Sequence, residues 1–408
     1  MTPTPAPEPS AVDVSSARPT PATLVRRIVG AAAVGAGSGV ASTVFLRSLS
    51  VVTDAHAAHP ELLWALPVLG LVIGLVVARW GGRAAGGVGL TMAEIEDLRG
   101  GVPLRMAPLA LGGTLLTHLG GGSAGREGTA VQMATGLTDG VARRLGLPVG
   151  DRRVLLIAAL AGGFGSVFGV PWAGFVFAVE VAPTSWRRRR DAAAAALVAA
   201  WTGHGVAHLL GIRHEVLAPL GRVGAADLLR VGAVGVGAGL VAAAFVRGVA
   251  AVRSLSVRLV PWAPARPAVG GAVLVLATVL AGTRAYSGLS LPLLDDALAG
   301  APVPDAAFAL KALLTALTVG SGLIGGEVTP LFVIGATGGS TMAGLVGGPA
   351  AVLSGVGMVA TFGAAANAPL ASAVMGVELF GWHAAPALVL GCLVARWCSG
   401  AGHLYAHR

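Results

Sequence analysis

The chain has 408 residues, of which 55% are hydrophobic and only 12% are charged. Ordinary soluble domains carry about 25% charged residues, so this composition excludes a water-soluble globular protein and predicts one that folds in a lipid bilayer. The net charge of +9 comes from arginines spread over many loops, with Lys311 as the single lysine. A nucleic-acid-binding protein would gather these charges on one soluble face, so no nucleic-acid partner is expected.

Residues 1–21 are rich in proline, alanine and serine and contain no apolar core, which predicts a disordered cytoplasmic tail and not a signal peptide. After this tail, apolar stretches approach the length of about 20 residues that spans a bilayer. We expect about ten or more complete or partial crossings. The stretches are residues 28–46, 62–77, 154–168, 192–210, 231–246, 268–281, 331–346 and 370–394.

Two groups of arginines predict the orientation of the chain. Arg26 and Arg27 precede the first apolar stretch, and residues 187–190 form the densest basic run. Positive residues beside membrane-spanning segments stay in the cytoplasm, so both groups indicate the cytoplasmic side of the cell inner (plasma) membrane. Contact with lipid headgroups is their expected role.

The chain contains two internal sequence matches that keep their order and spacing. Residues 125–130 match residues 325–330 in glycine, glutamate and threonine, and residues 164–180 match residues 362–378 in Phe-Gly, Pro-x-Ala and Val-Glu. Internal repeats of this kind are typical of transporters, so we predict two related halves, residues 22–213 and 214–408. The repeat partners Glu180 and Glu378 end apolar stretches, and we expect both at the membrane interface.

Two glycine clusters interrupt apolar segments at corresponding places in the halves, at residues 120–122 and 320–326. They predict half-helices that end inside the membrane, with helix N-termini at residues 125–128 and 325–328. Such an end presents unpaired N–H groups and a partial positive charge, which attract an anion. If both helix N-termini point at one site, they predict a pathway for anions and argue against one for cations.

Glu127 lies at the first of these helix starts, where a carboxylate inside the membrane is costly and is therefore a functional candidate. It could simply cap the helix or pair with Arg126. The Glu127 carboxylate could also mimic the transported anion and occupy the same N–H groups. Once protonated, it would lose its attraction to these groups and could swing away with the proton. Competition and proton carriage by one side chain would suffice for anion/proton exchange.

Residues 122–129, Gly-Ser-Ala-Gly-Arg-Glu-Gly-Thr, resemble the Gly-x-x-x-Gly-Arg/Lys-Glu-Gly-Pro segment of the CLC family of chloride channels and anion/proton antiporters. Residues 325–330 resemble its Gly-x-Phe-x-Pro segment, and the segments around Pro171 and Pro369 resemble two further signatures. The resemblance implies the CLC fold, an all-α polytopic membrane protein with two inverted-topology repeats of tilted and broken transmembrane helices. It also implies a homodimer.

The family resemblance implies roles for individual residues. Glu127 would be the gating and proton-carrying carboxylate, and Glu327 would support it by a hydrogen bond to Glu127 or Thr329, unless it only caps a helix. Thr329 could donate its hydroxyl to the anion or bond a backbone carbonyl instead. The residues that this resemblance places around the anion are Gly125, Arg126, Gly128, Val328, Thr329, Tyr405 and, in a selectivity loop at residues 87–90, Val88.

Within the family, the Arg-Glu-Gly-Thr and Gly-Glu-Val-Thr-Pro pair resembles the fluoride/proton antiporter branch. Val181 stands where chloride antiporters have an inner proton-relay glutamate, which favours this branch. Val88 departs from the serine of chloride-handling members and from the Met or Asn of fluoride members, so it leaves the identity of the anion open. We therefore expect export of fluoride in exchange for protons, with a chloride/proton antiporter or a passive chloride channel as the alternative.

An intramembrane enzyme that uses Glu127 and Glu327 as an acid/base pair is the remaining alternative, but no metal-binding His-Glu-x-x-His or activated nucleophile accompanies them. We expect no enzymatic activity, no cofactor and no metal. Cys392 and Cys398 have no further metal ligands near them in the sequence, so we expect them to be packed side chains. We expect the same of the lone His118. The sequence ends just after Tyr405, so no C-terminal regulatory domain is expected.

Overall fold

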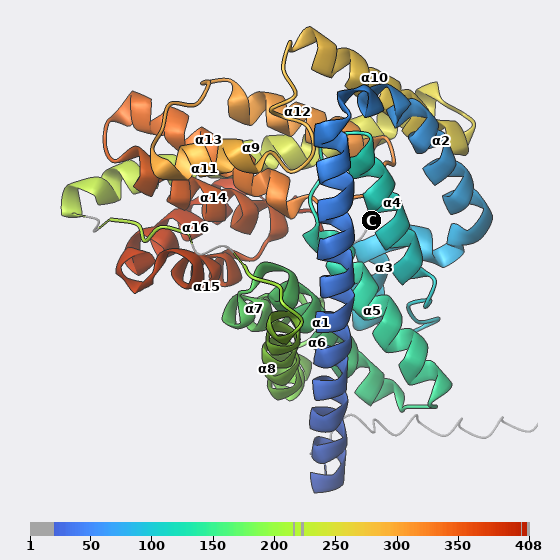
Figure 1. Ribbon diagram of the computed structural model, residues 1–408. Helices are drawn as coiled ribbons and strands as arrows, with labels where there is room; N and C mark the ends of the chain where they lie inside the picture. Colours follow the sequence, from blue (N-terminus) through green and yellow to red (C-terminus); the bar gives the residue numbers. More distant parts are fainter. Residues whose placement is uncertain (1–19, 215–216, 222–223, 401, 406–408) are drawn as a thin grey trace, which may run out of the picture.

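The described part of the chain is almost entirely helical (Figure 1). The computed structural model describes residues 20–214, 217–221, 224–400 and 402–405. Within these ranges the only pairing of strand type is one antiparallel bridge between Gly125 and Gly326. Most of the predicted tail, residues 1–19, lies outside the described residues, and the first helix begins at Pro21, where the Thr20 hydroxyl accepts the N–H of Thr23.

The helices fall into two series along the chain, coloured blue to green and yellow to red in Figure 1. The first series is α1 (Pro21–Ala58), α2 (Leu66–Val76), α3 (Gly87–Glu96), α4 (Met106–Leu119), α5 (Glu127–Arg144), α6 (Val149–Phe168), α7 (Pro171–Val181) and α8 (Trp186–Leu209). The second series is α9 (Ala225–Leu259), α10 (Arg266–Leu280), α11 (Leu291–Ala299), α12 (Ala307–Gly320), α13 (Val328–Val346), α14 (Ala350–Ala366), α15 (Pro369–Phe380) and α16 (Ala385–Ser399). Short 3₁₀ or π turns occupy Pro60–Ala65, Val77–Gly81, Gly82–Gly86, Ala263–Ala265 and Trp382–Ala384.

Six of the described helical segments are long and apolar enough to cross a membrane, and five more apolar helices of 10–17 residues are too short to cross it fully. This mixture fits the predicted set of complete and partial crossings. One expectation needs correction. Residues 370–394, which the sequence presents as one apolar stretch, form two helices, α15 and α16. Gly381 separates them with a φ of 91°, a left-handed conformation that ends α15 and that hydropathy alone does not reveal.

Small residues let the long helices pack closely. A Cβ added at Gly35 of α1 would meet the backbone of Ala199 in α8, and one added at Gly39 would meet Gly203. Such close approach replaces the hydrophobic drive that is missing between helices in lipid. The order of these contacts shows that α1 and α8 run in the same direction, so the beginnings of both helices lie on one face of the molecule.

One face of the molecule carries many arginines. Asp151 at the start of α6 accepts hydrogen bonds from Arg26 and from Arg27, the latter at 2.7 Å, and α8 begins there with residues 187–190. We call this the arginine-rich face. Arg47 lies some 20 residues further along α1, or about 30 Å at 1.5 Å per residue, and its guanidinium donates to the Leu210 carbonyl at the opposite face.

Candidate anion-binding site

Two broken helices place their N-termini side by side in the interior. Helix α4 ends at Leu119 and α5 begins at Glu127, while α12 ends at Gly320 and α13 begins at Val328. The connecting segments meet at the antiparallel bridge, where the Gly125 N–H donates to the Gly326 carbonyl at 2.6 Å and the Gly326 N–H donates to the Gly125 carbonyl at 2.9 Å. Both predicted helix starts are therefore present and adjacent.

The Glu127 carboxylate occupies the N-terminus of the opposite helix, α13. It accepts the backbone N–H of Thr329 at 3.1 Å, and the Thr329 hydroxyl donates to its other oxygen. The Arg126 N–H donates to it at 3.1 Å, and the Arg126 Nε lies 3.4 Å away. Only 1% of Glu127 is exposed. A buried carboxylate thus sits on the donors that an anion would use, and it pairs with Arg126 as well.

Hydroxyl and imidazole groups hold these segments in place. The Ser123 N–H and hydroxyl bond the side chains of Thr318 and Thr315 at 3.1 and 2.9 Å, which ties the α4–α5 connection to α12. His118 is buried, and its two ring nitrogens lie 2.9 Å from the Thr114 carbonyl and 3.2 Å from the Ala124 carbonyl. These contacts are those of a packed side chain.

Glu327 lies at the start of the other helix of the pair. Its carboxylate forms no hydrogen bond with Glu127 or Thr329 among the described residues, so the predicted support of the gate is not seen as a direct contact. Its Oε2 lies 3.8 Å from the position that a Cβ at Gly128 would take, near the beginning of α5. The Glu327 carboxylate therefore lies near the start of α5, whereas Val328 is buried at the start of α13.

The predicted loop at residues 87–90 is instead the first turn of α3, and Gly87 opens it with a φ of 55°. The position that a Cβ at Gly87 would take lies 3.4 Å from the side-chain oxygen of Gln132 in α5. Val88 packs against the hydrophobic core. The start of α3 therefore approaches α5 more than one turn beyond Glu127.

Tyr405 is joined to the site through a chain of aromatic rings. Its ring lies 6.0 Å from that of Phe177, edge to face, and the neighbouring Leu404 N–H donates to the Ala365 carbonyl at 2.9 Å. The further rings of this cluster are those of Phe164, Phe362, Phe332 and Phe168.

A cavity of about 490 Å³ connects this site with the face opposite the arginine-rich one. Its deep wall includes Arg126, Thr329 and Phe332, and its outer part is lined by Arg47 and Arg213, which are exposed. The carboxylates of Asp54 and Asp295 also line it, so the cavity carries side chains of both charges on the way to the donors of Thr329.

Comparison with known proteins decides the family. A profile of the family described as "Voltage gated chloride channel" matches residues 69–400. The chain is a member of the CLC family. A relative described as "Chloride/fluoride channel protein" from Pseudomonas syringae pv. tomato is 38% identical over 375 residues, which cover 90% of this chain and 83% of that protein.

Solved CLC structures confirm the predicted fold. The crystal structure of a CLC-type fluoride/proton antiporter is 30% identical, with a TM-score of 0.90 over 95% of this chain and 98% of that one. A slow cyanobacterial Cl⁻/H⁺ antiporter is 20% identical, with a TM-score of 0.77 over 94% of this chain and 95% of that one, and it supports the fold alone.

Sequence analysis missed a second pair of carboxylate contacts in this CLC protein. Glu180, at the end of α7, accepts the N–H groups of Leu370 and Ala371 at the start of α15, at 3.1 and 2.7 Å. Glu378, at the end of α15, accepts the N–H groups of Trp172 and Ala173 at the start of α7, at 3.0 and 2.7 Å. Each of the two helices caps the other. The sequence does carry a signal for these contacts, because each half contains a helix that begins with Pro and ends near Glu at the same spacing.

Proposed function

We propose that this CLC protein exports fluoride in exchange for protons, with Glu127 as the gate and the proton carrier. The observation that carries the proposal is the placement of the Glu127 carboxylate on the N–H and hydroxyl of Thr329. The fluoride/proton antiporter with a TM-score of 0.90 and the chloride/fluoride channel relative support the same activity.

The exchange follows from competition for one set of donors. A charged Glu127 holds the N–H and hydroxyl of Thr329 and closes the pathway. When a proton arrives through the cavity, the neutral carboxyl group loses most of its attraction to these donors and moves aside. Fluoride then takes the vacated donors, and return of the gate requires loss of the proton. Inward proton movement thereby drives fluoride outward.

Fluoride suits these donors because it is small, strongly hydrated and a strong hydrogen-bond acceptor. Its lost water must be replaced by good donors. The Thr329 hydroxyl and the N–H groups around Val328 are such donors, with Gly125, Gly128 and Arg126 around them and Tyr405 further along the aromatic cluster. Glu327, whose carboxylate lies near the start of α5, is assigned a supporting role for the gate.

The second candidate function is a chloride/proton antiporter or a passive chloride channel on the same fold. Val88 favours it, because this residue departs from the residues expected for fluoride members. Val88 lies in the first turn of α3, directly after Gly87, whose Cβ position would lie 3.4 Å from the Gln132 side chain in α5. From there it would shape the pathway.

Three further expectations belong to this proposal. The protein assembles as a homodimer in which each subunit has its own pathway, an inference that rests on family resemblance and that cross-linking of purified protein would test. Its arginine-rich face lies in the cytoplasm at the inner (plasma) membrane. Its two halves, residues 22–213 and 214–408, are inverted repeats, an idea that the mutual caps of α7 and α15 support.

Flux measurements test the activity. Purified protein in liposomes is loaded with fluoride or chloride, and anion efflux is recorded together with the internal pH. Fluoride efflux that exceeds chloride efflux and drives proton uptake supports the proposal. Equal efflux of the two anions would refute the fluoride assignment, and efflux without proton movement would refute exchange.

A further inference from the structure

The single lysine of the chain is buried without a carboxylate partner. Lys311 lies in the second turn of α12, its exposed fraction is 0%, and it forms no ion pair with any carboxylate in the described part of the chain. An ammonium group that leaves water is costly unless hydrogen bonds replace its hydration. The proposed exchange at Glu127 and Thr329 does not use Lys311, so its position needs another explanation.

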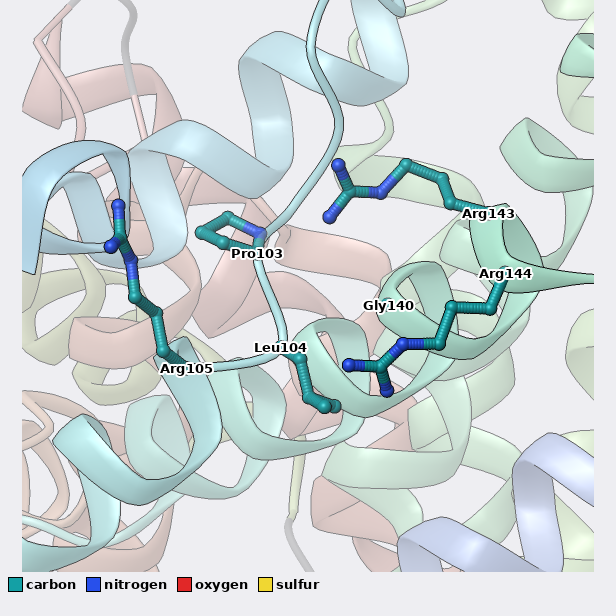
Figure 2. Close-up of a pocket in the computed structure, with 6 residues that line it drawn as sticks. All are labelled: Pro103, Leu104, Arg105, Gly140, Arg143 and Arg144. Atoms are coloured by element: carbon teal, nitrogen blue, oxygen red, sulfur yellow. The ribbon is translucent and has the colours of Figure 1, made fainter.

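Arginines elsewhere in the protein do not face this cost. Figure 2 shows Arg105, Arg143 and Arg144 around a cavity of about 420 Å³ between the loop before α4 and the end of α5. All three side chains are exposed. Water hydrates an exposed guanidinium, whereas the Lys311 ammonium depends on groups of the protein alone.

Three oxygen atoms of the loop between α10 and α11 surround the ammonium. The Lys311 Nζ donates to the Tyr286 carbonyl at 3.2 Å, to the Gly288 carbonyl at 2.7 Å and to the Ser290 hydroxyl at 2.9 Å. An ammonium group has three N–H donors, so all of them are used. We call these three acceptors the ammonium cage.

The backbone of the cage is bent into a conformation that is costly by itself. Gly288 has a φ of 57° and Ser290 has a φ of 58°. Residues with a side chain avoid this left-handed region because the Cβ atom crowds a carbonyl oxygen. Without the ammonium, two carbonyls and a hydroxyl would converge on one another with no donor between them. The bonds to Lys311 therefore hold the loop in its bent form.

The same loop forms part of the wall of the cavity that leads to Thr329. Leu289 and Leu291 line this cavity, and Leu289 lies between the two cage residues Gly288 and Ser290. A movement of the cage would therefore move side chains of the cavity wall, although Lys311 does not touch the anion.

Helix α12 connects this wall to the segment that carries the gate. Lys311, Thr315 and Thr318 follow at spacings of four and three residues, which places them on one face of the helix. Thr315 and Thr318 bond Ser123 in the α4–α5 connection, which leads to Glu127. One helix face thus contacts both the outer wall and the frame of the gate.

We propose that Lys311 is a positioning residue of the exchange, because its ammonium fixes the α10–α11 loop relative to the gate and so keeps the outer pathway open. The inference rests on the proposed function in one respect, the passage of anions and protons through this cavity.

Hydrogen–deuterium exchange read by mass spectrometry tests the cage without reference to transport. Lys311→Met keeps an unbranched side chain but removes the charge and all three donors. Each lost bond to a charged group shifts a local opening equilibrium by about tenfold or more. Amide exchange of residues 284–294 should therefore accelerate by at least about tenfold, while α5 and α13 should stay within about twofold of the unmodified protein.

Three further variants control this measurement. Lys311→Arg keeps the charge and donors and should restore most of the protection. Leu313→Met changes a side chain of α12 that is 52% exposed, and it should leave the loop unchanged. Ser290→Ala removes one acceptor and should accelerate loop exchange less than Lys311→Met does, which gives a reading even if Lys311→Met does not fold. Unchanged protection of the loop in Lys311→Met, or in Ser290→Ala where Lys311→Met does not fold, would overturn the proposal, as would equal acceleration in all helices.

Fluoride flux in liposomes tests the consequence for transport. Lys311→Met should lower the maximal exchange rate by about tenfold or more, because three charge-assisted bonds are lost together. The ratio of fluoride to protons should not change, since Glu127 and Thr329 are intact, and Lys311→Arg should recover the rate. A normal rate with a loosened loop would refute the positioning role while the proposed function stands. Lack of exchange in the unmodified protein would refute the proposed function and with it this role, but would leave the cage itself established by its amide protection.

Discussion

Thr329→Val tests the shared donor at the centre of the site. Valine keeps the approximate shape of threonine and the backbone N–H but removes the hydroxyl that donates to Glu127. A hydrogen bond to a charged group contributes about 1.5–3 kcal/mol. If fluoride uses the same hydroxyl, its binding to the open site weakens by roughly 10- to 100-fold, since about 1.4 kcal/mol corresponds to a factor of ten.

The size of this effect depends on pH, because the gate and the anion lose the same donor. When Glu127 is charged, the substitution also weakens its hold on α13, and the two losses partly cancel. When Glu127 is protonated, only the fluoride term remains. The half-saturating fluoride concentration of Thr329→Val should therefore rise most at acidic pH, where the full factor is visible.

The assay is fluoride flux through the protein in liposomes at a series of fluoride concentrations and at several pH values. Thr329→Ser is the matched control, since it keeps the hydroxyl and should stay close to the unmodified protein. An unchanged half-saturating concentration in Thr329→Val at acidic pH would refute the shared donor. A serine variant as impaired as the valine variant would assign the effect to packing.

Three further substitutions probe the gate, its frame and the caps. Glu127→Gln removes the proton carrier, and we expect proton uptake to vanish in the pH-monitored flux assay; coupled exchange at the normal ratio would contradict this. Gly326→Ala would place a Cβ 2.9 Å from the Gly128 N, so transport should fall while the protein remains folded by size-exclusion chromatography. Glu180→Gln weakens two charge-assisted bonds at the start of α15, and a loss of about 1–3 kcal/mol should lower the unfolding temperature; an unchanged temperature would show that the cap is not stabilising.

The place of the site could be anticipated because it depends on local signals. A carboxylate beside a glycine-broken apolar segment is costly in lipid, and a matched segment in the second half supplies a helix start for it. These two signals predict that both helix starts point at one site where Glu127 competes with the anion, whereas its bonds to Thr329 are visible only in the fold. The helix starts at residues 127 and 328 followed from the same glycine clusters.

Other features depended on tertiary distance and left no such signal. The division of residues 370–394 into two helices requires the left-handed backbone of Gly381, whereas hydropathy reads the stretch as continuous. The approach of the Glu327 carboxylate to the start of α5 depends on how two distant segments pack, so residue spacing could not predict it.

The four glutamates of the matched segments share one arrangement, and their differences explain why only one is suited to move. Glu127 reaches the start of α13, Glu180 the start of α15, Glu378 the start of α7, and the Glu327 carboxylate lies near the start of α5. Each carboxylate thus faces a helix start in the other half of the chain.

Mobility follows from what surrounds each carboxylate. Glu180 and Glu378 each accept two backbone N–H groups of a helix that in turn carries the other glutamate, so release of one loosens the cap of both. The donors of Glu127 border a cavity lined by Thr329 and Arg126. In the proposed exchange, another anion replaces the carboxylate there without leaving those donors unsatisfied. On the proposed mechanism, a helix N-terminus serves transport where a second anion can displace its carboxylate. Where no anion can reach it, the carboxylate remains a structural cap.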